Sequence, residues 1–330
     1  MRCARAIYHC RMRVRRNSRK QCVLRLAVSR TQSGEPLDWQ VDGLDWPNRA
    51  RSRFVSAAGL LWHVQDFPSG RHDAPLVLLL HGTASATHSW RDVAPLLAQH
   101  SRVIAIDLPG HAFSEMPMPA SGQSLPGMAQ RLAGLLQQMQ LKPDLLVGHS
   151  AGAAVAARMV LDGSVRPAAL VSLNGAFIRF GGMAGAIFSP LARLMATGSL
   201  TAKFFAWQAN DPVVIQRLMR STGSVIDATG MRLYQRLMQS PGHVRAALAM
   251  MAHWDLDTLE RELPKLSLPV WLVAAENDLT VPPQQATTVA QRLPQAKRVL
   301  WPMLGHLAHE ESPRQCVELL AEVMQAEGAV

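Results

Sequence analysis

The segment Asp144-Leu145-Leu146-Val147-Gly148-His149-Ser150-Ala151-Gly152 decides the fold of this chain. An apolar, strand-like run enters a Gly-x-Ser-x-Gly motif, and a small-residue helical stretch follows from Ala153 to Leu161. A strand that turns sharply into a helix at such a serine is a nucleophile elbow, which holds the serine at a strained backbone position with its hydroxyl exposed. Larger side chains at Gly148 and Gly152 would clash across the turn. The motif therefore predicts that Ser150 is a nucleophile.

The remaining members of a hydrolytic triad follow in the order expected for this elbow, an acid and then a histidine. Asp278 comes just after the strand-like run 270–275, and His306 follows the short run 298–301. In the predicted mechanism His306 takes the proton of Ser150, while Asp278 fixes the imidazole tautomer and stabilises the imidazolium. The catalytic prediction is Ser150, Asp278 and His306.

Each of these assignments has an alternative in the sequence. Glu276 lies in the same turn as Asp278, although the loop position favours Asp278. The preceding strand-like run 170–173 ends in Asn174, which cannot act as a carboxylate. His309 is the alternative base; if it is not catalytic, it is expected to be a solvated residue of the final helix. The motif context favours the earlier histidine.

Acyl transfer also needs two backbone N–H groups that point at the developing oxyanion. One is predicted from Ala151, the residue after the nucleophile. The other is predicted from Thr83, because the apolar run 76–80 leads into His81-Gly82-Thr83. His81 and His149 are expected to brace their loops. Asp107, in the turn after the next strand, is expected to have a structural role only.

Strand and helix patterns alternate along the chain. A strand pair is expected across 53–66, with further strands at 76–80, 102–106, 144–148, 169–173, 270–275 and 298–301. Helices are expected at about 91–99, 127–140, 151–162 and 313–326, the last with Ser312 as N-cap and Pro313 in its first turn. This alternation predicts an α/β fold, with a mostly parallel central sheet and helices on both faces.

The stretch 177–264 separates two core strands and lacks strand periodicity, so it is expected to form a helical cap over the active site. The predicted organisation is a basic leader (1–36), a first core part (37–176), the cap (177–264) and a second core part (265–330). The cap is rich in methionine and aromatic residues. An ordinary helix core explains most of them, and the functional alternative is a large apolar pocket. The candidate substrate contacts are Trp90, Phe177, Met183, Phe188, Trp207, Met251 and Trp254.

The positive charge of the chain is concentrated at its N-terminus. Residues 1–34 contain ten of the 34 Lys and Arg residues and none of the 24 Asp and Glu residues, so the rest is formally neutral. The leader is open to three interpretations: a basic arm that contacts an anionic membrane, a targeting segment, or an upstream extension from a misplaced start codon. Nucleic-acid binding is not expected, because no recognised motif accompanies the charge.

The cysteines do not indicate a metal or redox site. Cys3, Cys10 and Cys22 lie in the leader and Cys316 in the final helix, and no Cys-x-x-Cys pair exists. We therefore predict no metal and no cofactor. Free thiols suit a reducing cytoplasm. No apolar run approaches the roughly 18 residues that a transmembrane helix needs.

From about Arg53 to the C-terminus, the succession His-Gly, Asp-x-Pro-Gly-His, Gly-His-Ser-x-Gly, Asn-Asp and Gly-His resembles the α/β-hydrolase superfamily. A narrower resemblance is scattered beyond residue 36. Asp42-Gly43-Leu44-Asp45-Trp46-Pro47-Asn48-Arg49, His88-Ser89-Trp90-Arg91-Asp92 and Met250-Met251-Ala252-His253-Trp254-Asp255-Leu256 are similar to the hydrolase-like magnesium-chelatase accessory proteins (BchO-type) of bacteriochlorophyll synthesis.

The resemblance implies a role in or beside the magnesium-chelatase step, with chelatase subunits as partners. The expected location is cytoplasmic, with a peripheral position at the photosynthetic membrane as the alternative. It leaves two functions open. One is an active serine hydrolase of an ester or related bond in a small apolar metabolite; the other is a non-catalytic accessory protein that binds a tetrapyrrole. For a tetrapyrrole, Arg179, Arg193 and Lys203 are the candidates to meet carboxylates at the mouth of the pocket.

Overall fold

The structure is a computed structural model, and it describes residues 36–179 and 198–329. Residues 1–35 of the predicted basic leader lie outside these residues, as do the candidates Met183, Phe188 and Arg193. Among the described residues, no helix combines the length and the hydropathy that crossing a bilayer requires.

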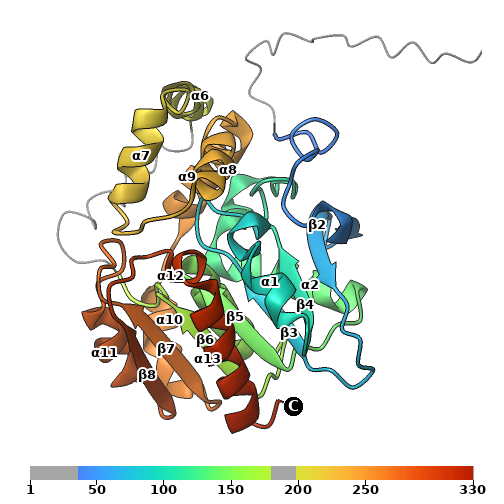
Figure 1. The fold of residues 1–330 in the computed structure, drawn as a ribbon, viewed down its shortest axis with the longest axis vertical. Coiled ribbons are helices and arrows are strands. Elements are labelled where there is room, and N and C mark those ends of the chain that lie inside the picture. Colours follow the sequence, from blue (N-terminus) through green and yellow to red (C-terminus); the bar gives the residue numbers. More distant parts are fainter. Residues whose placement is uncertain (1–35, 180–197, 330) are drawn as a thin grey trace, which may run out of the picture. The chain divides into compact units, whose positions relative to one another are not determined.

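An eight-stranded sheet in the order β1-β2-β4-β3-β5-β6-β7-β8 forms the centre of the fold (Figure 1). The strands are β1 (Ser52–Ala57), β2 (Leu60–Phe67), β3 (Leu76–Leu80), β4 (Arg102–Ile106), β5 (Leu145–His149), β6 (Ala169–Leu173), β7 (Val270–Ala275) and β8 (Ala296–Trp301). β2 runs antiparallel to both β1 and β4, and all other pairs are parallel. Every predicted strand is present, although β8 begins two residues earlier than expected.

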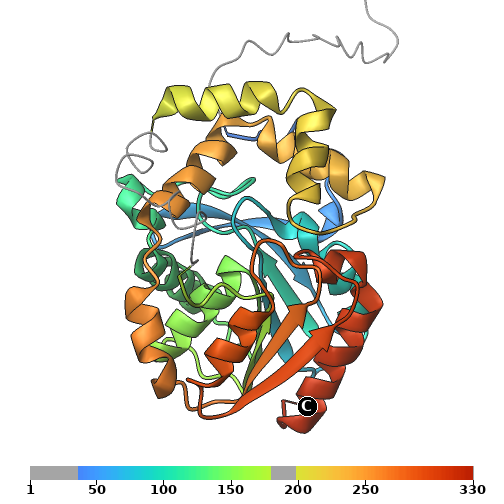
Figure 2. The ribbon, with the colours of Figure 1, turned by 90° about the vertical axis from the view of Figure 1, so that its left-hand side faces the viewer.

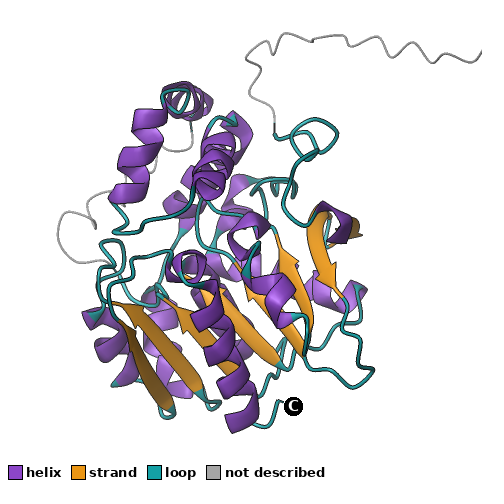
Figure 3. Ribbon diagram, in the orientation of Figure 1, coloured by secondary structure: helices purple, strands orange, loops and turns teal. Residues whose placement is uncertain are grey.

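Helices cover both faces of the sheet because both faces are apolar (Figure 3). In β3, Leu78 and Leu80 join the core beneath one helical layer, whereas Val77 and Leu79 join the core beneath the other. The first layer contains α2 (Leu125–Gln138), α3 (Ala151–Leu161), α10 (Asp257–Glu262) and α11 (Gln284–Ala290). The second contains α1 (Val93–Leu97), α12 (Ala308–Glu311) and α13 (Pro313–Ala326). The predicted α/β architecture is confirmed.

The final helix matches its prediction in extent but not in its cap. α13 begins at Pro313 and ends at Ala326, as expected. Ser312 occupies the N-cap position, yet its side chain accepts no hydrogen bond from the first turn. The proline supplies the start signal, since its fixed φ suits the first helical position and it has no N–H to satisfy.

Four helices between β6 and β7 lie over the carboxyl ends of the parallel strands; Figure 2 places them together beyond the sheet. We call them the insertion helices: α6 (Ser199–Gln208), α7 (Pro212–Arg220), α8 (Ala228–Met238) and α9 (Pro241–His253). Asp211, Asp227 and Ser240 cap α7, α8 and α9 by accepting backbone N–H groups of the first turn. These polar N-cap residues explain why a stretch without strand periodicity forms several short helices.

The residues before β1 connect α8 to the core. The Nε1 of Trp46 donates to Thr87 Oγ1 at 3.1 Å, and its ring is buried. Arg236 of α8 pairs with Asp45 at 2.6 Å, which anchors the outer end of that helix. Short 3₁₀ turns complete the connections at Arg49–Arg51, Thr87–Trp90, Ala120–Gln123 and Leu263–Lys265.

Candidate active site

Ser150 lies at the junction of β5 and α3 with φ 50° and ψ −118°. Residues other than glycine rarely adopt this backbone conformation. The turn is held because the N–H of Ser150 donates to Leu173 O at 3.0 Å. The two flanking glycines have no room for a side chain. A Cβ on Gly148 would lie 2.4 Å from the backbone of Ala153, and one on Gly152 would lie 2.3 Å from Leu80 O. The glycines thus permit the close approach that the motif predicts.

His306 and Asp278, far apart in the sequence, form a buried hydrogen bond. Nδ1 of His306 donates to Asp278 Oδ2 at 2.8 Å. The other carboxylate oxygen accepts the N–H groups of Thr280 and Val281, at 2.7 and 2.8 Å. Because Nδ1 carries the proton, Nε2 of His306 is left as the proton acceptor.

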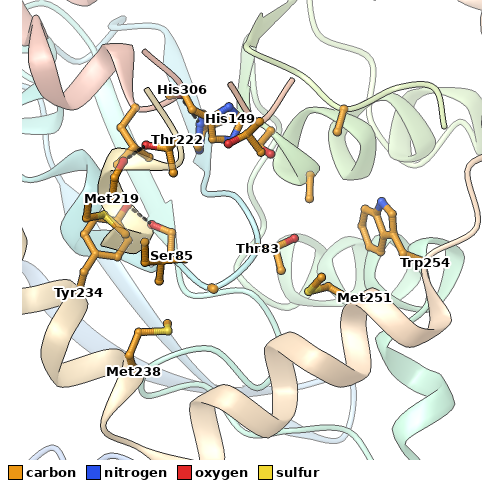
Figure 4. A pocket seen from close by; sticks show the side chains of 17 residues that line it. Thr83, Ser85, His149, Met219, Thr222, Tyr234, Met238, Met251, Trp254 and His306 are labelled. Carbon is orange, nitrogen blue, oxygen red and sulfur yellow. Dashed lines mark hydrogen bonds between the residues drawn. The ribbon is translucent and has the colours of Figure 1, made fainter. Parts of the chain in front are cut away.

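Ser150 and His306 line the same cavity, in which Figure 4 labels His306. No hydrogen bond joins these two described side chains in this structure. Such contacts are often long in apo hydrolases and tighten when substrate binds. The arrangement therefore holds a serine hydroxyl and an unprotonated imidazole nitrogen at one surface.

The two alternative residues have other roles. Glu276 is exposed and accepts the N–H of Met303 at 3.1 Å. The expectation that His309 is solvated is wrong, because its side chain is fully buried. Its Nε2 donates to Ser89 Oγ at 2.8 Å, and its ring packs 4.5 Å from that of Trp90. Burial lowers the pKa of His309 to about 3, which keeps it neutral.

The backbone N–H groups of Thr83 and Ala151 are available for an oxyanion. Both residues line the cavity beside Ser150, and neither N–H donates to any group in the described part of the chain. Gly82 lets the Thr83 loop approach the elbow, since a Cβ there would lie 3.0 Å from the Cβ of Ser150. Free donors at a helix start are suited to a developing negative charge.

Asn174 positions the histidine loop, a role that the sequence analysis missed. Its Nδ2 donates to Gly305 O at 3.1 Å and to His306 O at 2.8 Å, and its Oδ1 accepts the N–H of Ala275 at 2.8 Å. His149 donates to the same His306 carbonyl at 2.9 Å, as part of the bracing expected of it. An asparagine directly after a buried strand was the available signal, since Asn tolerates the observed φ of 48°.

The cavity has a volume of about 240 Å³, and its wall is predominantly apolar. The insertion helices provide that wall through Leu218 and, as Figure 4 shows, through Met219, Tyr234, Met238 and Met251, with Trp254 following α9. Two of the candidate substrate contacts, Met251 and Trp254, therefore lie in the cavity wall.

The structure does not bring three other candidates to this cavity. Trp90 is fully buried against His309, and Phe177 is buried in the core beneath α3. Trp207 is exposed on α6. An aromatic residue in the sequence indicates an apolar side chain. Hydrophobicity alone does not distinguish a core position from a cavity wall or an outer surface.

The proposed carboxylate-binding cations also lie elsewhere. Arg179 pairs with Asp257 at 2.7 Å, and Lys203 is exposed on α6; neither lines the cavity. Within the described ranges, no cluster of three or more His, Cys, Asp or Glu side chains is arranged to hold a metal ion.

A buried polar network links α8 to the loops of the site. Tyr234 donates to Glu310 Oε1 at 2.7 Å and accepts from Ser85 Oγ at 3.2 Å. Glu310 also pairs with Arg91 at 2.5 Å and accepts from Ser89 Oγ at 2.6 Å. Burial holds the pKa of Tyr234 well above its ordinary value, with the Glu310 charge adding to the effect. Tyr234 therefore stays a neutral donor in the cavity wall.

Comparisons with known proteins agree with this geometry. Residues 75–313 match the profile of the alpha/beta hydrolase fold family. The chain is 37% identical to the "Magnesium-chelatase 30 kDa subunit" of Rhodobacter capsulatus, over 81% of this chain and 92% of that one. It is 28% identical to a "Pimeloyl-[acyl-carrier protein] methyl ester esterase" of Nitrosomonas europaea, over 74% and 94%. A crystal structure of an α/β-hydrolase fold protein from Burkholderia ambifaria superposes with a TM-score of 0.67 at 22% identity, over 82% and 99%. The chain thus belongs to the α/β-hydrolase family and is similar to the magnesium-chelatase 30 kDa subunit.

Proposed function

We propose that this chain is a serine hydrolase that cleaves an ester-type bond, with Ser150 as nucleophile, His306 as general base and Asp278 as the carboxylate that orients His306. The observation that carries the proposal is the 2.8 Å hydrogen bond between His306 and Asp278, at the cavity into which the elbow presents Ser150. Nothing in the packing of the fold requires all three side chains at one point.

In the proposed reaction, the hydroxyl proton of Ser150 moves to Nε2 of His306 as Oγ bonds to the substrate carbonyl carbon. The carbonyl oxygen becomes an oxyanion that accepts the N–H groups of Thr83 and Ala151. The bond to the leaving alcohol then breaks, and the imidazolium returns the proton to that alcohol. Water hydrolyses the acyl-serine by the same steps, with His306 again as base.

The cavity supports a small apolar substrate group. Its volume of about 240 Å³ is below the roughly 300–1,000 Å³ of sites for drug-sized ligands. Three methionines in the wall allow the cavity to adapt to different apolar groups. The similarity to a methyl ester esterase is consistent with the hydrolysis of a carboxylic ester.

The similarity to a magnesium-chelatase subunit supports a role in or beside the chelatase step of (bacterio)chlorophyll synthesis, with chelatase subunits as partners. A whole tetrapyrrole exceeds the cavity, so we propose that only a substituent at the edge of the ring would enter it. The alternative is a non-catalytic accessory protein that binds a tetrapyrrole, and this alternative rests on the same relative.

A fluorophosphonate probe tests the hydrolase proposal directly. Wild-type protein should be labelled at Ser150, and Ser150→Ala and His306→Ala should not be labelled. Ser121→Ala, at an exposed serine of the turn before α2, is the matched control and should be labelled like the wild type. Labelling that survives in both site variants would refute the assignment.

A second experiment separates the two functions. Reconstituted magnesium chelatase would be assayed with the wild-type protein and with Ser150→Ala. If hydrolysis is needed, only the wild-type protein should stimulate magnesium insertion. Equal stimulation by both would favour the accessory function and would contradict a catalytic role in this step.

A further inference from the structure

Helix α6 is packed with its small residues inward and its large residues outward. Its alanines at i and i+4, Ala202 and Ala206, are buried and pack against Val244 of α9, and Ala209, directly after the helix, is also buried. Its aromatic side chains are 52%, 46% and 61% exposed, respectively: Phe204, Phe205 and Trp207. Leu200 is also exposed on the same helix. In a helix selected only for folding, the largest apolar side chains face the core.

These aromatic residues are exceptional within the described ranges. Every phenylalanine and tryptophan that is highly exposed there lies on α6. None of them lines the cavity, so the proposed reaction does not explain them. α6 is also the part of the insertion farthest from the sheet in Figure 1 and Figure 2. A cluster of exposed aromatic residues at such a position marks an interaction surface.

Positive charge lies on α6 itself and on α7, the next helix along the chain. Lys203 on α6 and Arg217 and Arg220 on α7 are exposed, and none of them forms an ion pair with a described carboxylate. From residue 198 to residue 226, Asp211 is the one acidic residue, and its carboxylate accepts the N–H of Val213. Apolar aromatic groups beside unneutralised cations complement a partner that is apolar inside and anionic outside.

We propose that the outer side of α6, with the cations of α6 and α7, docks on the surface of an anionic lipid bilayer. Aromatic rings suit the boundary between headgroups and acyl chains, and basic side chains suit anionic headgroups. A second copy of this chain is a poorer occupant. A symmetric pairing through α6 would place the cations of both copies in one interface, where like charges repel.

This surface is connected with the cavity through α7. Leu218 is 41% exposed and also lines the cavity that contains Ser150. An apolar substrate dissolved in the bilayer would therefore enter beside Leu218. This last step rests on the proposed hydrolase function, whereas docking itself does not.

The test uses the full-length protein and vesicles of phosphatidylcholine alone or mixed with phosphatidylglycerol. Acyl chains carrying bromine quench tryptophan that enters the bilayer, and Trp207 is the highly exposed tryptophan among those described. We expect saturable binding to the anionic vesicles with quenching, and loss of that quenching in Trp207→Phe. The double variant Phe204→Ser/Phe205→Ser should bind at least tenfold more weakly.

The matched control is Leu300→Ser, at an exposed apolar residue of β8, which should bind like the wild type. Thermal midpoints should be unchanged in all variants, because the replaced side chains are exposed.

The basic leader is a second positively charged segment that attracts anionic vesicles. Quenching of Trp207 therefore decides whether α6 itself contacts the bilayer. Vesicle binding without quenching of Trp207 and without sensitivity to the double variant would overturn the proposal. So would lipid-independent dimerisation that the double variant abolishes, or no vesicle binding. None of these outcomes depends on whether Ser150 is catalytic.

Discussion

The hydroxyl of Tyr234, on α8, donates a 2.7 Å hydrogen bond to Glu310, a carboxylate four residues beyond His306. The same hydroxyl accepts from Ser85, in the loop that follows Thr83. One side chain of the insertion helices thus contacts the loop that carries Thr83 and the short helix α12 that follows His306.

Replacing Tyr234 by phenylalanine should remove both hydrogen bonds while the ring still fills the cavity wall. The buried Oε1 of Glu310 would keep only Ser89 as a donor, so the free energy of unfolding should fall by about 1–3 kcal/mol. The rate of fluorophosphonate labelling should also fall several-fold. Urea denaturation and labelling kinetics would measure the two effects. An unchanged labelling rate in a destabilised variant would limit Tyr234 to a structural role.

Asp278→Asn should abolish most activity without unfolding the protein. The asparagine oxygen can still accept the N–H groups of Thr280 and Val281, which preserves the loop. Its amide nitrogen would face Nδ1 of His306 as a donor and favour the wrong imidazole tautomer. A loss of roughly 10³–10⁴-fold in the hydrolysis of a simple ester is expected. A full rate in this variant, with a normal thermal midpoint, would exclude the orienting role.

Gly82→Ala tests the close approach of the oxyanion loop to the elbow. The new Cβ would lie 2.9 Å from Nδ1 of His149 and 3.0 Å from the Cβ of Ser150, so these neighbours must shift by a few tenths of an ångström. The variant should hydrolyse esters more slowly, since a misplacement of 1 Å costs about 10²-fold in rate. Gly70→Ala is the control, because nothing lies within 4 Å of its added Cβ. Equal ester hydrolysis by both variants would show that the loop tolerates the methyl group.

Stability should fall steeply as the pH decreases below about 6.5. Six buried histidines have pKa values that burial lowers: His81, His88, His111, His149, His243 and His309. In the unfolded chain their pKa is about 6.5, so the unfolded state binds more protons below that pH. Their contribution is complete above pH 6.5 and is lost as the pH falls towards the folded-state values. Urea denaturation from pH 7.5 to pH 5 would measure this slope.

His243 offers a specific variant for that slope. Its Nδ1 accepts the N–H of Ala112 at 3.0 Å, which protonation would prevent, and burial lowers its pKa to about 4. His243→Gln should reduce the slope below pH 6.5 by about 1.4 kcal/mol per pH unit. His72→Gln, at an exposed loop position, should leave it unchanged. A variant slope equal to that of the wild type would assign the acid sensitivity to other groups.

The elbow could be predicted from the sequence because its motif is short and partly explained by local contacts. A Cβ on Gly148 would clash with the backbone of Ala153, just after the motif, whereas one on Gly152 would clash with Leu80 O of β3, a contact that only the folded sheet creates. The strands were predictable for a related reason. Buried parallel strands are short, continuous apolar runs, and their order along the chain does not depend on contacts elsewhere.

The surroundings of the proposed active site depended on contacts that no short window contains. In the sequence, Asn174 indicates only that no acidic member of the triad follows β6. In the fold, its side chain holds the backbone of His306, 132 residues away. His309 has a helical, polar neighbourhood in the sequence, but the core places it beneath Trp90. Trp90, Phe177 and Trp207 do not line the cavity for the same reason. The sequence pattern identifies them as apolar, but it does not show which surface of the fold they face.

The sequence by itself determined the hydrolase fold, the strained position of Ser150 and the order in which serine, acid and histidine follow along the chain. Only the tertiary structure decided which side chains form the cavity and which way α6 faces. α6 is apolar on both sides, so its periodicity specifies no inner face. Packing against α9 determines the inner face of α6. The small side chains of Ala202 and Ala206 allow the two helices to approach more closely than aromatic rings could.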